Sequence, residues 1–137
     1  ARSAFDGSMD ESAVMELEER CARFFQYSAA HAWEALARMC ADGAVFAQNG
    51  HENDLEGLMT MLHGLTGSGI EYSYANARRT VAPTDRRVVE QHQVTMRRGD
   101  GVEASADVCV VLQFDDQGAI VRVDEYADPA AFAPLFR

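Results

Sequence analysis

The sequence lacks any apolar run long enough to cross a bilayer, and no basic N-terminal segment precedes an apolar stretch. Since a membrane-spanning helix needs about 20 apolar residues and a secretory signal needs both segments, neither is predicted. Cysteine is scarce as well, because Cys21, Cys40 and Cys109 lie far apart without a C-x-x-C pair. This odd, dispersed set predicts neither a zinc cage nor a disulfide framework. Reduced thiols in the cytoplasm are the expectation.

Positive charge is also scarce, with 12 basic against 22 acidic residues and a formal net charge of −10 at pH 7. Nucleic acids and anionic membranes both require a cationic face, so neither is expected as a partner. Three arginine pairs stand at expected strand ends, where solvated charges are usual: Arg78-Arg79, Arg86-Arg87 and Arg97-Arg98.

The chain contains no repeat and no Pro-rich or Ser-rich linker. Its 137 residues and hydrophobic fraction of 47% are those of one ordinary globular domain. We expect that domain over residues 9–137. Residues 1–8 are interpreted as a remnant of cloning or a disordered leader.

The first half of the chain has the apolar period of helices. Apolar residues recur at helical spacing from Ser12 to Ser28 and again from Trp33 to Cys40, and a short strand follows over residues 44–48. Asp54 is placed to cap a third helix, because its side chain can accept a hydrogen bond from the first turn. Gly64, in a glycine-rich stretch, ends that helix.

After residue 70 the apolar period changes from 3.6 to 2, which is typical of strands. Strands are predicted over 70–81, 87–97, 102–114 and 119–126, and a short helix begins at Pro129. Tyr72 and Tyr74 are interpreted as sheet packing. Helices followed by strands predict an α+β fold, in which a curved antiparallel sheet wraps around three helices.

Two strings give a family resemblance. Residues 35–46, ALARMCADGAVF, resemble the second helix, turn and first strand of the SnoaL-like, nuclear-transport-factor-2-like superfamily. Residues 114–120, FDDQGAI, with 125–128, EYAD, resemble the end of such domains. The resemblance implies a cone with an internal pocket, a cystatin-like roll, shared by polyketide cyclases, ketosteroid isomerases and limonene-epoxide hydrolases. A small, largely apolar molecule is the implied ligand.

The catalytic residues of ketosteroid isomerases are not reproduced in this chain. Their tyrosine, base and late-strand acid correspond to Phe24, Gln48 and Val110, none of which can move a proton. Asp107 lies three residues before Val110, an odd offset that points it to the opposite face. Steroid-type isomerisation by that machinery is therefore disfavoured.

The resemblance to limonene-epoxide hydrolases is partial. Their last-strand aspartate corresponds to Glu125, a carboxylate that can activate water. The first-strand positions hold Phe46 and Gln48, which keep an amide and lose a hydroxyl. The middle-strand positions fall near Gln91 and Gln93, which lack both the acid and the cation.

Strand alternation selects a candidate site. If Val88 and Val94 face inward, then Glu90 and His92 face inward too. A histidine beside carboxylates is a usable proton shuttle near neutral pH. The candidate catalytic residues are His92, Glu125 and Gln48, and the candidate ligand-binding residues are Phe24, Phe46, Glu90, Val110 and Leu112. The alternative for His92 is a purely structural pairing with Glu90 or Glu125.

These residues predict a small-molecule enzyme without a cofactor, performing isomerisation, cyclisation, dehydration or hydrolysis on a polyketide-, terpenoid- or steroid-like metabolite. The alternative is a non-catalytic ligand-binding or dimerisation module. No metal is expected, because the acidic string at residues 51–54 is better explained by the Asp54 cap. A homodimer is expected through the outer sheet face, which mixes apolar and polar groups: Val89, Gln91, Gln93, Thr95, Cys109 and Val111.

Overall fold

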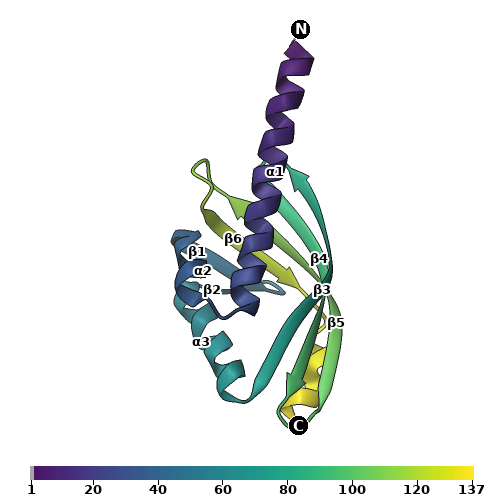
Figure 1. Ribbon diagram of the computed structural model, residues 1–137. Coiled ribbons are helices and arrows are strands. Elements are labelled where there is room, and N and C mark those ends of the chain that lie inside the picture. The colour runs from purple at the N-terminus through teal and green to yellow at the C-terminus, as the bar shows by residue number, and fades with distance from the viewer. Residues whose placement is uncertain (1) are drawn as a thin grey trace.

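The computed structural model describes the backbone of residues 2–137 and the side chains from residue 11 onward. Helices α1 (Arg2–Ala29), α2 (Trp33–Arg38) and α3 (Leu55–Gly67) accompany one six-stranded sheet, and the 3-10 helix η1 (Pro129–Phe136) follows the last strand. The strands are β1 (Cys40–Gln48), β2 (His51–Asn53), β3 (Ile70–Ala82), β4 (Arg87–Arg98), β5 (Glu103–Phe114) and β6 (Ile120–Tyr126). The long strands curve, and α1 crosses their concave face (Figure 1). The α+β prediction is confirmed.

Helix α1 begins at Arg2, ten residues before the predicted start at Ser12. Its first turns project beyond the sheet, whereas its second half packs on the sheet (Figure 1). The packed side follows the predicted helical period, with Leu17, Cys21 and Phe24 buried. The origin of residues 1–8 stays a prediction. Within residues 2–137, none of the helices is long and apolar enough to cross a membrane.

The sheet has the strand order β2-β1-β6-β5-β4-β3. Strands β3 to β6 form the predicted antiparallel series. The sheet as a whole is mixed, because β1 runs parallel to its neighbour β6. This pairing joins strands far apart in the chain, and it places Gln48 directly beside Glu125.

Strand β2, at His51–Asn53, was not among the predicted strands. Asn49 and Gly50 form the connection back from β1, and both have positive φ, 49° and 85°. A two-residue turn with positive φ at both positions matches the twist of a hairpin, and Asn-Gly is its preferred sequence. The Asn49 side chain also bonds the backbone N–H and carbonyl of Ala127, which ties this hairpin to the end of β6.

A bulge in β3 reverses which side chains face inward. Between the pairs Ala75–Gln93 and Arg78–Gln91, β3 contains one residue more than β4, and Asn76 adopts φ 59°. An extra residue in one strand shifts the alternation beyond it. Tyr74 therefore faces inward before the bulge, and Arg79, opposite Glu90, faces inward after it.

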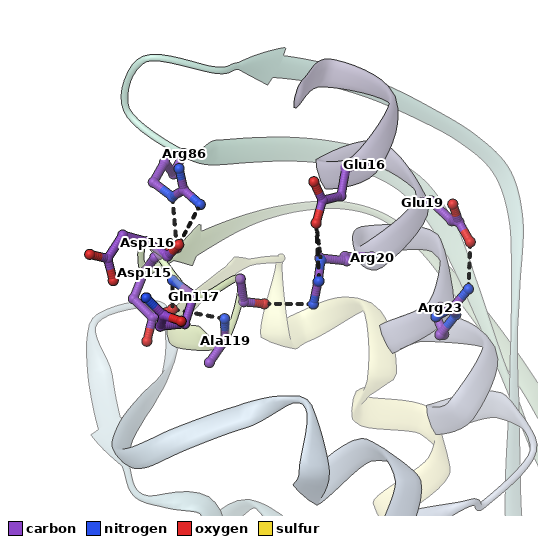
Figure 2. Close-up of polar contacts among 10 residues, drawn as sticks. Glu16, Glu19, Arg20, Arg23, Arg86, Asp115, Asp116, Gln117 and Ala119 are labelled. Atoms are coloured by element: carbon purple, nitrogen blue, oxygen red, sulfur yellow. Dashed lines mark hydrogen bonds and ion pairs between the residues drawn. The ribbon is translucent and has the colours of Figure 1, made fainter. Parts of the chain in front are cut away.

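One end of the molecule is closed by arginines that bond backbone carbonyls (Figure 2). Arg20 of α1 donates to the Gly118 carbonyl at 3.0 Å, and Arg86 donates to the Asp115 and Asp116 carbonyls at 2.7 and 3.1 Å. Arg86 is half-buried rather than fully solvated, which corrects the prediction for that pair. These bonds hold the β5–β6 turn against α1 and the β3–β4 turn.

The two faces of β4 differ as the alternation predicted. Val88, Glu90, His92 and Val94 are buried on the inward face. The opposite face is exposed or half-buried, and Asp107 of β5 is exposed on it beside Gln93, as predicted. A homodimer through this outer face stays a prediction.

Candidate functional site

A cavity of about 460 Å³ lies between the concave sheet face, α1, α3 and η1. Sites for small organic ligands have volumes of roughly 300–1,000 Å³ and mostly apolar walls with a few polar groups. The apolar wall comprises Phe24, Phe25, Leu36, Phe46, Ala47, Leu58, Met61, Leu62, Leu65, Val94, Met96, Val108, Val110, Val123, Ala127, Pro129, Phe132 and Phe136. The polar lining comprises Ser28, Gln48, Asn49, Tyr72, Tyr74 and Glu125. Size and lining both suit a small, largely apolar ligand.

The structure brings five of the eight predicted site residues to this cavity: Phe24, Phe46, Gln48, Val110 and Glu125. The remaining three, Glu90, His92 and Leu112, are buried but do not line it. Alternation along the strands therefore identified the correct face for all three. It did not show how deep below the cavity wall each side chain lies.

Glu125 is the only carboxylate among the residues lining the cavity. It lies on β6 between Gln48 of β1 and Val110 of β5. Burial raises its pKa, because an ionised carboxylate loses solvation among apolar groups, and the nearby charge of His92 partly opposes this shift. Within the part of the chain whose side chains are described, no hydrogen bond reaches the Glu125 carboxylate. Its oxygens are left to a ligand or to water.

A second carboxylate, Glu90, is 1% exposed and held by three partners. Arg79 Nε donates to Oε1 at 2.6 Å, the His92 Nδ1 atom lies 2.5 Å from Oε2, and Cys21 Sγ lies 3.7 Å from Oε1. A carboxylate oxygen accepts hydrogen bonds from the groups around it. With Glu90 Oε2 as the acceptor, His92 donates from Nδ1.

His92 lies one layer behind the cavity wall. Its ring packs against Phe25 and Tyr74, with centroids 4.9 and 4.8 Å away, and both of those residues line the cavity. From this position its charge lowers the pKa of Glu125. The His92 ring itself does not line the cavity.

Five polar residues of the site were missed by sequence reasoning, among them Asn49 of the β1–β2 turn. Arg79 was interpreted as a solvated strand-end charge, which is wrong because the β3 bulge turns it toward Glu90. Tyr72 and Tyr74 were interpreted as packing alone, yet both line the cavity and both hydroxyls bond Ser28. The two-residue spacing of the tyrosines carried a signal, since it placed both on one face. Nothing in the sequence marked Ser28.

Sequence comparison assigns the family. The SnoaL-like domain family matches residues 21–123, so the chain belongs to it. This agrees with the α+β fold, in which helices pack on the concave face of a curved sheet. A comparison with curated proteins found no match.

Solved structures share the fold at low sequence identity. The BvnE pinacolase of Penicillium brevicompactum has a TM-score of 0.75 and 18% identity, covering 89% of this chain and 92% of its own. A putative polyketide cyclase from Xanthomonas campestris pv. campestris has a TM-score of 0.73 and 15% identity, with coverages of 83% and 91%. An epoxide hydrolase of M. tuberculosis, described as LEH-like, has a TM-score of 0.72 and 16% identity, covering 88% of each chain. At these identities the likeness establishes the fold alone.

Proposed function

We propose that this protein is a cofactor-free acid–base enzyme whose substrate is a small, largely apolar metabolite of the polyketide, terpenoid or steroid type. The observation that carries the proposal is Glu125, a half-buried carboxylate whose pKa is raised by burial, on the wall of a largely apolar cavity. Acids and bases that work near neutral pH need pKa values moved toward that range, and burial is one way to move a carboxylate.

The chemistry follows from the proton that Glu125 can hold. As a carboxylate it removes a proton from a carbon or hydroxyl of the bound substrate, and as an acid it returns that proton at another position. Isomerisation, cyclisation and dehydration each consist of such a removal and return. Gln48 lies beside Glu125 across the parallel strand pair and also lines the cavity. Its amide is placed to orient the substrate with either a donor or an acceptor.

The activities named for structural neighbours support this reaction class. A pinacolase, a putative polyketide cyclase and an epoxide hydrolase share the fold and cover most of this chain. Transfer of their chemistry to this protein is part of the proposal, because one fold carries many different sites.

A non-catalytic ligand carrier is the second candidate. Phe24 and Val110 favour it, since they line the cavity as apolar groups at positions where isomerases of this fold carry proton-active residues. A carrier and an enzyme share every binding property of the cavity. They differ only in whether a bound compound is converted.

A ligand screen followed by a turnover assay tests the proposal. Polyketide, terpene, terpene-epoxide and steroid compounds are screened by thermal shift, and a ligand at a hundredfold excess over its Kd stabilises the folded state by about 2.7 kcal/mol. Each compound that binds is then incubated with the protein and analysed by mass spectrometry and chiral chromatography. We expect conversion of at least one bound compound. Tight binding of several compounds with no conversion of any would favour the carrier.

A further inference from the structure

Three hydroxyl groups meet at the cavity wall beside β3, which is separated in the sheet by β4 and β5 from β6, the strand that carries Glu125. Ser28 is near the end of α1, and Tyr72 and Tyr74 are on β3 before its bulge. Ser28 Oγ lies 3.1 Å from the Tyr72 hydroxyl and 3.0 Å from the Tyr74 hydroxyl. The Tyr72 hydroxyl also donates to the Ser28 backbone carbonyl at 2.9 Å. All three residues line the cavity.

The hydrogens of this cluster can be counted. Each hydroxyl has one hydrogen to donate and lone pairs to accept. Tyr72 uses its hydrogen on the backbone carbonyl of Ser28. The single hydrogen of Ser28 can then go to Tyr72 or to Tyr74, but not to both.

These two arrangements give Tyr74 opposite hydrogen-bonding characters. When Ser28 donates to Tyr72, Tyr74 donates to Ser28, and the Tyr74 oxygen can accept from a ligand. When Ser28 donates to Tyr74, the Tyr74 hydrogen is left for a ligand. Rotation of two hydroxyl hydrogens interconverts the arrangements without moving a heavy atom.

Tyr74 stays a neutral hydrogen-bonding group rather than an ionised base. Burial raises its pKa, and the charges of Glu125 and Glu90 raise it further. The hydroxyl cluster and Glu125 are separate polar groups on the wall of one largely apolar cavity.

We infer that the Tyr74 hydroxyl binds an oxygen atom of the ligand. Because the direction of its hydrogen bond with Ser28 can reverse, the same position binds either a carbonyl or a hydroxyl. The ligand class is an apolar ring compound that carries a ketone or an alcohol. The inference deepens the proposed function, on which it rests for the statement that the cavity holds a ligand. A site of this kind keeps its hydrogen bond when the bound oxygen changes from an acceptor to a donor, as it does between a ketone and its enol.

The test measures the Kd of three matched probes, namely 2-tetralone, 2-tetralol and tetralin, by calorimetry or ligand-observed NMR. In the unaltered protein both oxygenated probes are expected to bind more tightly than tetralin. Tyr74→Phe is expected to weaken both about tenfold and to leave tetralin unchanged, as the loss of one hydrogen bond requires. Circular dichroism melting confirms that the variant is folded.

Ser28→Ala distinguishes Tyr74 as a donor from Tyr74 as an acceptor, because it affects the ketone and alcohol probes differently. It also replaces Tyr74→Phe as the test if that variant does not fold. Without Ser28, Tyr74 can still donate to a ketone. An alcohol that accepts from Tyr74 in the same way leaves its own hydrogen buried without a partner, and an alcohol that donates to Tyr74 leaves the Tyr74 hydrogen without one. We expect 2-tetralol to bind about tenfold more weakly and 2-tetralone to change less than about threefold.

The inference is overturned if the variants lose affinity equally for all three probes or keep their affinities unchanged. It is also overturned if the unaltered protein does not prefer the oxygenated probes or binds none of the three. Its failure differs from failure of the proposed function. A substrate whose turnover needs Glu125 while Tyr74→Phe leaves probe affinities intact would refute the inference alone. The expected probe pattern without turnover of any compound would refute only the proposed catalysis.

Discussion

Glu125→Gln is expected to lower kcat for the substrate identified by the screen about 10²–10⁴-fold, the contribution typical of a positioned acid–base group. Glutamine keeps the size and hydrogen-bonding oxygen of the side chain but cannot take up a proton. Substrate affinity should change little, so the loss appears in kcat rather than in KM. The matched control is Glu71→Gln, which neutralises an exposed carboxylate on β3. An unchanged kcat in Glu125→Gln would contradict the assignment.

The same variant is expected to be more stable than the unaltered protein at neutral pH. Because burial raises the pKa of Glu125, the native state binds more protons than the unfolded state between the ordinary glutamate pKa of about 4.3 and the raised value. Stability therefore falls as pH rises through this window. The difference in Tm between Glu125→Gln and the unaltered protein should be smallest below the ordinary pKa, grow across the window, and then level off.

His92→Gln distinguishes an electrostatic effect on Glu125 from simple support of the wall. Glutamine keeps an N–H group that can donate to Glu90, but it removes the charge that lowers the pKa of Glu125. The acid limb of the kcat/KM profile, which reports Glu125, should therefore move to higher pH. A purely structural defect would lower activity at all pH values and leave the midpoint of that limb in place.

Most of the fold could be predicted from local patterns. Apolar periods located the helices and the four long strands, because side chains must alternate or recur every 3.6 residues to reach one core. The parallel pairing of β1 with β6 could not be read this way, since it joins segments about 75 residues apart. The β1–β2 hairpin had a local signal in Asn49-Gly50, which was overlooked because β2 itself is only three residues long.

Only part of the candidate site could be predicted, because the available signal is again a local pattern along each strand. Alternation assigns a side chain to a face of the sheet, so Glu90 and His92 were correctly grouped on the inward side, where the family resemblance also placed Glu125. It does not report depth, and only Glu125 of these three reaches the cavity. Arg79 was not predicted to face inward, because a one-residue bulge at Asn76 reverses the alternation. A strict period-2 pattern cannot predict such a reversal.

The buried ion pair between Arg79 and Glu90 is expected to contribute strongly to the stability of the fold. Glu90→Ala is expected to destabilise the protein by about 3–5 kcal/mol, because it leaves Arg79 and His92 without the carboxylate that binds both. Urea unfolding followed by circular dichroism measures the change, with the slope m checked for two-state behaviour.

Strand β5 offers the matched control. Glu103 of β5 pairs with Arg97 of β4 at 2.9 Å, also across neighbouring strands, but its side chain is 45% exposed where that of Glu90 is 1% exposed. Exposed pairs contribute at most about 1 kcal/mol, because water already solvates both charges. Glu103→Ala should therefore cost less than about 1 kcal/mol. Equal losses for the two variants would mean that burial does not set the energetic weight of Glu90, and the ordering of His92 by that carboxylate would lose its physical basis.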